Sequence, residues 1–263
     1  MQFQTENGYV QSRKYVEQRA KLNAELVDVV HSVGDSSTLE EAFGFIAEFV
    51  KTQSGTLLAV KISDWSESQE PIRPHSNFPE ALKAVIRQLK HQGGCPMTKE
   101  SRERLAPFSY QSVDRQKYAT LLDRRFFQET DRLGFKDIAI IPVMAGRGIL
   151  IATVGLNQIY DRKLRSYSSA VMPHFTAAIL ANFPQVAKLF EGKLLSELET
   201  SVLTAHCKGL SSQEVGELVG ISVQSLPLVW KSAEKKLEAS NRYQAVYRAI
   251  AIGELDLPRN LEI

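Results

Sequence analysis

One stretch of the chain reads Leu195-Ser-Glu-Leu-Glu-Thr-Ser-Val-Leu203, then Gly209-Leu-Ser-Ser-Gln-Glu-Val-Gly-Glu-Leu218, then Gly220-Ile-Ser222 and Ser225 to Leu237. It contains the same helix-start pattern twice, because Ser196 to Glu199 and Ser211 to Glu214 both have the Ser-x-x-Glu spacing of a capping box. In a capping box the serine oxygen accepts from the backbone of the first turn, and the glutamate accepts from the backbone N–H of the serine. The pattern therefore predicts short, well-bounded helices.

Two further helices follow from the apolar spacing of the same region. A third helix is expected to begin near Ser225, after a turn at Gly220-Ile-Ser222, and a fourth near Arg242. Two short helices joined by a tight turn that contains glycine are typical of a helix-turn-helix. A helical bundle that never contacts DNA is the alternative interpretation of the same helices.

The stretch resembles the C-terminal domain of LuxR-type transcription regulators, position by position, at Glu199, Leu203, Gly209, Leu218 and Gly220. The resemblance implies a four-helix DNA-binding domain over residues 195–263. It also implies that the helix beginning near Ser225 enters the major groove of DNA.

The chemistry of that helix departs from the family. Pro227 stands where the family usually has Lys or Arg, and Val229 where it often has His. Proline is acceptable in a first helical turn, but it makes no charge-assisted contact with phosphate or guanine. Trp230 favours a protein contact over base reading. The residues expected to contact DNA are Ser225, Lys231, Lys235, Lys236 and Arg242.

The charge of this region leaves two interpretations open. From residue 194 onward the sequence has seven Lys and Arg against nine Asp and Glu, a balance of −2, whereas the whole chain carries +2. DNA affinity depends strongly on phosphate neutralisation. Either the domain binds DNA through its remaining cations with an altered choice of sequence, or it binds DNA poorly and its apolar helix docks on another protein.

The residues before this region predict an α+β domain, an α/β/α sandwich in which helices cover both faces of an antiparallel sheet. Helices are expected over 9–33, 39–52, 80–91, 115–133 and 164–183, and strands over 56–62, 138–143 and 148–155. A loop is expected to hold Gly93, Gly94, Pro96 and Pro107. The predicted organisation is a sensor or dimerisation domain over 1–183, a linker over 184–194 and the helix-turn-helix domain over 195–263. The linker is not rich in Gly and Ser, so limited freedom is expected.

The upstream part resembles the sensor domain of the same family, which binds N-acyl homoserine lactones. In an ungapped alignment over residues 78–110, the two tryptophans of the family pocket fall on Leu82 and Tyr110, its tyrosine on Ile86 and its aspartate on Cys95. Further along the chain, a pocket glycine of the family falls on Ile138.

These replacements predict that lactones bind poorly or not at all. Leu82 and Ile86 have no hydrogen-bond donor, and the Cys95 thiol is a poor substitute for a carboxylate. Each buried polar interaction that is missing costs about 1–3 kcal/mol. The domain could instead bind a more apolar molecule, fold with a filled cavity, or serve only to pair with another subunit. A redox role of Cys95 is a further alternative.

Composition and motifs exclude several classes of protein. No apolar run reaches the about 20 residues that a membrane helix needs, and the first residues lack the pattern of a signal peptide. Two distant cysteines indicate free thiols in a reducing cytoplasm. No phosphate loop, nucleophile elbow or metal-ligand spacing is present, so neither an enzyme nor a cofactor is expected.

The expected function is that of a cytoplasmic, dimeric transcription regulator of LuxR type that binds DNA without an acyl homoserine lactone. The alternative is an anti-activator, which would pair with a related regulator and bind DNA poorly. DNA and a second subunit, identical or related, are the expected partners.

Overall fold

The computed structural model describes residues 20–65, 71–92 and 94–255. Two compact units can be distinguished among them. The first contains the described residues up to Lys61, together with Arg73–Val143 and Ile151–Ala187. The second contains the described parts of 62–72, the segment Met144–Leu150, and the chain from Lys188 onward.

A five-stranded sheet forms the centre of the first unit, with the strand order β2-β1-β5-β4-β3. The strands are β1 (Gly55–Asp64), β2 (Ile72–Ser76), β3 (Phe108–Ser109), β4 (Asp137–Ala145) and β5 (Gly148–Leu156). The sheet is antiparallel, as predicted, and Phe108 of β3 pairs with Ile140 of β4. Strands β2 and β3 were not predicted, because five and two residues are too few to show an alternating pattern.

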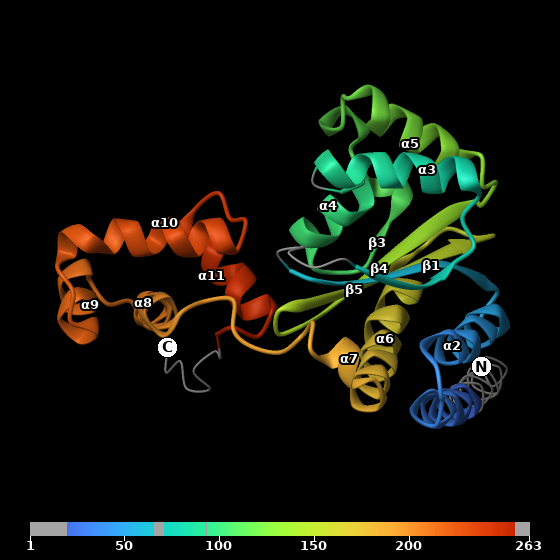
Figure 1. Ribbon diagram of the computed structural model, residues 1–263, viewed down its shortest axis with the longest axis horizontal. Helices are drawn as coiled ribbons and strands as arrows, with labels where there is room; N and C mark the ends of the chain where they lie inside the picture. Colours follow the sequence, from blue (N-terminus) through green and yellow to red (C-terminus); the bar gives the residue numbers. More distant parts are fainter. Residues whose placement is uncertain (1–19, 66–70, 93, 256–263) are drawn as a thin grey trace, which may run out of the picture. The chain divides into compact units, whose positions relative to one another are not determined.

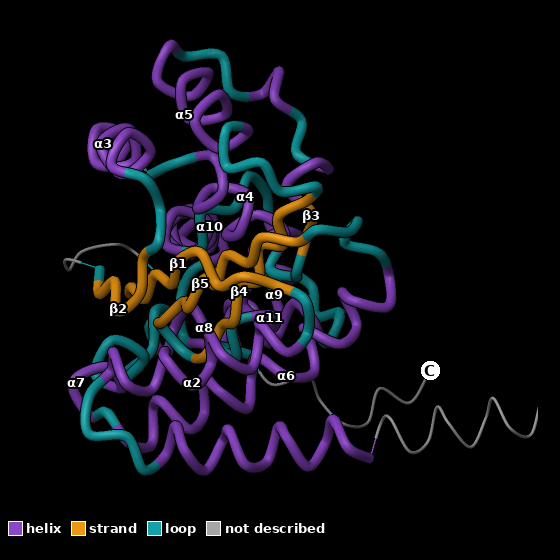
Figure 2. Tube along the Cα trace, turned by 90° about the vertical axis from the view of Figure 1, so that its right-hand side faces the viewer, coloured by secondary structure: helices purple, strands orange, loops and turns teal. Residues whose placement is uncertain are grey.

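Helices cover both faces of this sheet, which confirms the predicted α+β fold (Figures 1 and 2). On one face lie α3 (Glu80–Leu89), α4 (Pro96–Arg104) and α5 (Leu121–Asp131). On the other lie α2 (Leu39–Thr52) and α6 (Arg162–Asn182). None of the helices in the described part of the chain is long and apolar enough to cross a bilayer.

Most predicted helices of the first unit agree with the structure. Helix α2 has the bounds predicted for it, and residues 20–34 are helical, while residues 9–19 of that predicted helix lie outside the described part. The predicted loop is wrong at Pro96, because Pro96 begins α4 with Cys95 as its N-cap residue. Proline suits a first turn because its missing N–H would have no helical partner there.

The helix predicted over 115–133 is shorter than expected. Arg115–Lys117 forms a separate 3-10 turn, and α5 begins at Leu121. Its start is set by a capping box in which Thr120 accepts from the backbone of Asp123, and the Asp123 carboxylate accepts from the backbone of Thr120. The apolar periodicity runs across this boundary and therefore did not reveal it.

The second unit contains four helices that follow the sequence-based expectation: α8 (Glu197–Cys207), α9 (Ser212–Val219), α10 (Leu226–Lys236) and α11 (Arg242–Ala251). Both predicted capping boxes are present, Ser196 with Glu199 and Ser211 with Glu214. Because each cap satisfies backbone groups that the helix itself leaves free, these helices begin where the serines stand.

The turn between α9 and α10 depends on two glycines. Gly220 ends α9 in the left-handed region with φ 71°, which a residue without a side chain adopts at little cost. A Cβ on Gly216 would lie 2.8 Å from the carbonyl oxygen of Ile221, so the returning chain needs glycine at that position. The two glycines allow α10 to leave the turn directly against α8.

A buried carboxylate joins α8 to α10. The side chain of Glu199 is 5% exposed and accepts from Ser232 Oγ at 2.6 Å and from Lys236 Nζ at 2.6 Å, besides its cap on Ser196. Burial raises the pKa of Glu199, but the hydrogen bonds from Lys236, Ser232 and Ser196 outweigh it and hold the pKa below its usual value. The carboxylate therefore stabilises the helical unit in its charged form.

The segment that leads into α8 is packed rather than extended. It begins with α7 (Pro184–Ala187), and the Arg147 N–H donates to the carbonyl oxygen of Phe190 at 3.3 Å. The Phe190 ring covers Gly148, where a Cβ would overlap it. The Glu254 carboxylate accepts from the backbone N–H groups of Leu194 and Leu195. These contacts hold the segment along its length.

Replacing Glu199 with glutamine should weaken the helical unit by about 1–3 kcal/mol at pH 7, since the uncharged amide loses the ion pair while the partly exposed lysine regains water. A carboxylate with a lowered pKa stabilises the fold above its unfolded pKa of 4.5 and loses this effect as the pH falls. The difference between the variant and the wild type should therefore shrink below pH 4.5. Hydrogen exchange of the α8 and α10 backbone amides measures this difference in stability between the variant and the wild type.

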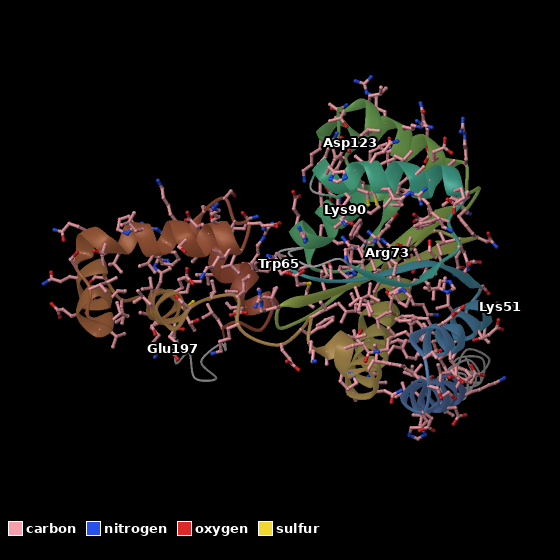
Figure 3. The ribbon with its side chains drawn as sticks, in the orientation of Figure 1. Lys51, Trp65, Arg73, Lys90, Asp123 and Glu197 are labelled. Carbon is pink, nitrogen blue, oxygen red and sulfur yellow. The ribbon has the colours of Figure 1, made fainter. Side chains whose placement is uncertain are left out.

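Glu197→Gln is the matched control, because Glu197 lies in the same first turn and is exposed (labelled in Figure 3). It should change the stability by no more than a few tenths of a kcal/mol, in the manner of a surface charge. Equal effects of the two substitutions would contradict the role assigned to Glu199.

Candidate ligand pocket and DNA-contacting surface

Helix α10 has an inner and an outer face. Leu226, Trp230 and Ala233 lie on the inner face and are buried, and Leu237 continues that face beyond the helix. Proline at position 227 lies in the first turn, where its missing N–H costs nothing. The spacing of the buried residues leaves the opposite side of the helix to solvent.

The outer face carries a stripe that consists of Pro227, Lys231 and Lys235, each separated by four residues and each exposed. Leu228 lies beside it and is 70% exposed. Residues four apart lie above one another on a helix, so the two lysines are neighbours. We refer to Pro227, Lys231 and Lys235 as the outer stripe. It places two cations on the outward side of the helix predicted to contact DNA.

Lys236 and Ser225 were also expected to contact DNA, but they do not belong to the outer stripe. The ammonium of Lys236 is paired with the buried Glu199 inside the unit, so it is engaged in holding two helices together. Ser225 ends a 3-10 turn, and its Oγ lies 2.8 Å from Ser222 Oγ. The sequence did not reveal the Lys236 pair, since its partner lies 37 residues away.

Trp230 is part of the core of the helical unit. Its side chain is 5% exposed and meets the His206 ring edge-on, with a centroid distance of 5.1 Å. The Arg242 guanidinium lies 5.2 Å from the indole centroid, which is a cation–π contact. The interpretation of Trp230 as a contact for another protein is therefore wrong. Arg242 remains exposed at the start of α11.

The aligned pocket positions come from several elements of the first unit. Leu82 and Ile86 lie on α3, where Leu82 is 1% exposed and Ile86 is half-buried. Ile138 lies on β4 and is 4% exposed. Side chains alternate along a strand, and Ala139 and Ile141 line a cavity beside α6. Ile138 therefore faces the side of the sheet that α3 and α5 cover.

Tyr110 is buried and its hydroxyl has partners within the protein. The hydroxyl donates to Asp131 Oδ1 at 2.8 Å and to the carbonyl oxygen of Phe127 at 3.2 Å. Arg115 completes the group with two ion-pair contacts to Asp131. Burial and the neighbouring Asp131 carboxylate raise the pKa of Tyr110. The hydroxyl ties the end of α5 to the loop before it.

Cys95 lies at the start of α4 and is half-buried. Its Sγ is 3.5 Å from Thr98 Oγ1, the spacing of a first-turn contact. Both Cys95 and Cys207 are free thiols, and burial raises the pKa of Cys207. A raised pKa leaves Cys207 protonated and unreactive near neutral pH.

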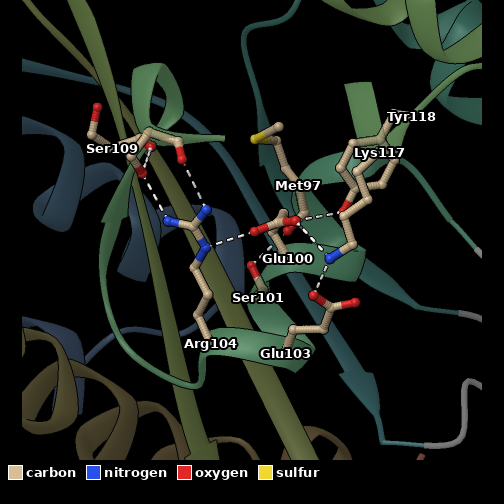
Figure 4. A network of polar contacts seen from close by, with 9 residues as sticks. Met97, Glu100, Ser101, Glu103, Arg104, Ser109, Lys117 and Tyr118 are labelled. Atoms are coloured by element: carbon tan, nitrogen blue, oxygen red, sulfur yellow. Dashed lines mark hydrogen bonds and ion pairs between the residues drawn. The ribbon is translucent and has the colours of Figure 1, made fainter. Parts of the chain in front are cut away.

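A polar network on α4 was missed in the sequence (Figure 4). The buried Glu100 carboxylate accepts from Tyr118 Oη at 2.7 Å, Arg104 Nε at 2.6 Å and Lys117 Nζ at 3.1 Å. Burial raises the pKa of Glu100, and these three donors together hold it below its usual value. The four-residue spacing of Glu100 and Arg104 was the available signal for one of these contacts. The network attaches the loop before α5 to α4.

No cluster of three or more His, Cys, Asp or Glu residues that could hold a metal ion occurs within residues 20–65, 71–92 and 94–255. The candidate sites are therefore the outer stripe of α10 and the aligned pocket positions of the first unit.

Known proteins resemble this chain. The model of the autoinducer binding domain matches residues 41–178, just over half of the chain. A protein of Sinorhizobium fredii (strain NBRC 101917 / NGR234), described as a candidate HTH-type transcriptional regulator and named y4qH, is 25% identical over 187 residues. That match covers 69% of this chain and 56% of the relative, so the chain spans little more than half of the relative's length.

Among solved structures, Escherichia coli SdiA matches with a TM-score of 0.47 and 14% identity, over 88% of this chain and 98% of SdiA. The LuxR family factor CepR2 of Burkholderia cenocepacia, described as dependent on N-acylhomoserine lactone, matches with a TM-score of 0.48 and 15% identity. This match covers 64% of this chain and 99% of CepR2.

The family match spans the sheet from α2 to α6, the region in which the altered pocket positions lie. The family consists of transcription regulators rather than enzymes, which agrees with the expectation from the sequence. The chain belongs to the family of LuxR-type regulators that carry an autoinducer binding domain.

Proposed function

We propose that this protein is a cytoplasmic, dimeric regulator that binds DNA through α10 and does not respond to acyl homoserine lactones. The observation that carries the proposal is the outer stripe of α10, which presents Lys231 and Lys235 to solvent on a capped helix-turn-helix. Exposed lysines on one side of a recognition helix can neutralise phosphates on both sides of a groove. Arg242 at the start of the next helix and Ser225 before α10 would add contacts.

The proposed independence from lactones follows from the pocket positions. Leu82 and Ile138 are buried and offer only hydrocarbon, and the Tyr110 hydroxyl already donates within the protein. A ligand amide and lactone would lose their partners on transfer from water into such surroundings, which costs free energy for each unpaired group. A protein of this kind would act without a ligand or with a more apolar one.

Selection from a duplex library tests the proposal. The ligand-free protein is mixed with duplexes that have a random central sequence, and the bound fraction, measured by fluorescence anisotropy, is sequenced. An enriched site with two-fold symmetry is expected, because a symmetric dimer binds two half-sites. Affinity should fall on the order of a hundredfold between 50 and 200 mM salt. No enriched site, even at low salt, would contradict the proposal.

The two lysines of the outer stripe should act as phosphate contacts. Lys231→Ala combined with Lys235→Ala is expected to weaken binding about equally on all duplexes and to lower the salt slope by about one for each phosphate that is no longer neutralised. Lys208→Ala is the control, because this exposed lysine follows α8 and lies outside the stripe. A weakening confined to one DNA sequence would indicate base reading instead.

Acyl homoserine lactones should not bind. Isothermal titration of the folded protein with N-hexanoyl and N-octanoyl homoserine lactone is expected to show no saturable heat at micromolar ligand, because the donors for the ligand carbonyls are absent. Circular dichroism of the same sample serves as the control for folding. Micromolar or tighter binding of either lactone would contradict the assignment of the pocket positions.

The anti-activator function has one specific observation in its favour. Pro227 and the highly exposed Leu228 form an uncharged end of the outer face. Such an end suits a protein partner better than DNA. Failure of the duplex selection, together with formation of a stable complex with a related regulator, would favour this second function.

A further inference from the structure

A groove of about 420 Å³ lies in the second unit between α8 and the end of α9. Two leucines on its walls are open to solvent, since Leu198 of α8 is 38% exposed and Leu218 of α9 is 63% exposed. A single exposed leucine is common on a protein surface, but two that share one groove form an apolar patch, which is typical of a contact site. The lining also includes Glu197, Ser201, Lys208 and Val219.

The groove has opposite charges at its two ends. Glu197 lies in the first turn of α8, and Lys208 follows the last turn of the same helix as its C-cap residue. The length of the helix separates them by about 16 Å. Both side chains are exposed, and neither has an ion-pair partner among the described residues. An occupant that runs along α8 should therefore carry a cation near the start of the helix and an anion near its end.

The last described residues of the chain lie beside the Glu197 end of this groove. The Glu254 carboxylate accepts from the backbone N–H of Leu194 at 2.6 Å and of Leu195 at 3.2 Å, which fixes it next to the residues that precede α8. Residues 256–263 follow in the sequence and lie outside the described part. A fully extended segment of this length spans about 26 Å, which is more than the length of α8.

The composition of residues 256–263 fits the groove. Their sequence is Asp-Leu-Pro-Arg-Asn-Leu-Glu-Ile. Pro258 favours an extended backbone at Leu257, and in an extended segment Leu257 and Leu261 share one face. The cation Arg259 precedes the anion Glu262, which is the order of charges that an occupant needs along α8. A cavity of about 150 Å³ holds benzene, so a groove of about 420 Å³ accommodates both leucine side chains.

We propose that residues 256–263 of this chain bind along the groove, in the same direction as α8. Their two leucines cover the exposed leucines of the groove, and their cation and anion face Glu197 and Lys208. The bound segment holds α9 against α8 and covers a surface that would otherwise be open to a partner. The inference concerns a contact within one chain and goes beyond the proposed function.

Methyl NMR of the full-length protein tests the contact directly. Nuclear Overhauser contacts are expected between the methyl groups of Leu257 or Leu261 and those of Leu198 or Leu218. They should persist on dilution, because the segment belongs to the same chain. The absence of these contacts would overturn the proposal. Contacts that disappear on dilution would also overturn it, since they would come from a second copy of the chain.

A substitution in the segment measures how firmly it binds. Leu261→Ser should speed the hydrogen exchange of the α9 backbone amides about five- to tenfold, since it removes one aliphatic side chain from the groove. Asn260→Ser is the matched control, because the adjacent residue of an extended segment points to the other side. It should leave the exchange rates unchanged. Equal rates in the two variants would mean that the segment does not cover α9.

A charge reversal identifies the ion pair and the direction of the segment. Arg259→Glu should speed the same exchange about two- to fivefold, which is the range of an exposed ion pair, and adding Glu197→Arg should restore the wild-type rate. Glu217→Arg is the matched control for the second substitution, because Glu217 is an exposed acid of α9 that does not line the groove. Restoration by both substitutions, or by neither, would contradict the pairing. Duplex binding is measured separately, so failure of this contact leaves the proposed function standing.

Discussion

Burial of β4 and β5 on both faces is the constraint on which the first unit depends. The two strands are almost continuously apolar, so neither face can meet water and helices must cover both. The alternation of side chains then assigns Ile138 and Ile140 to the α3 side and Ala139 and Ile141 to the α6 side. A single strand thereby contributes Ile138 to the aligned pocket positions on one face and lines an apolar hollow on the other.

In the second unit, the buried charges decide which cations remain available. Glu199 and Glu254 accept hydrogen bonds inside the unit, while Lys236 and Arg248 donate inside it. Two acids and two bases are engaged in this way, so these contacts leave the charge balance of −2 over residues 194–263 unchanged. Of the three lysines that the sequence suggested for DNA contact on α10, Lys236 is engaged inside the unit, so the DNA contacts of this helix depend more strongly on Lys231 and Lys235.

Local signals predicted the parts of the fold that short-range chemistry decides. The two serine capping boxes gave the starts of α8 and α9, and the turn at Gly220 preceded α10 as expected. Helix α4 was missed because a proline was interpreted as a loop residue, although proline also suits a first turn. The short strands β2 and β3 form only because they pair with the longer strands beside them. Such pairing between distant segments leaves no pattern in the local amino-acid sequence.

The sequence by itself determined the types of most elements, the capped starts of α8 and α9, the absence of hydrogen-bonding side chains at Leu82, Ile86 and Ile138, and the missing cation at Pro227. Each of these follows from residue identity and from spacing within about one helical turn. Only the tertiary structure decided that Trp230 is buried, that Glu199 holds Lys236, that the Tyr110 hydroxyl binds Asp131 and that an apolar cavity lies beneath α6. These features join residues far apart in the chain, and such contacts arise only when the packing of whole helices and strands brings them together.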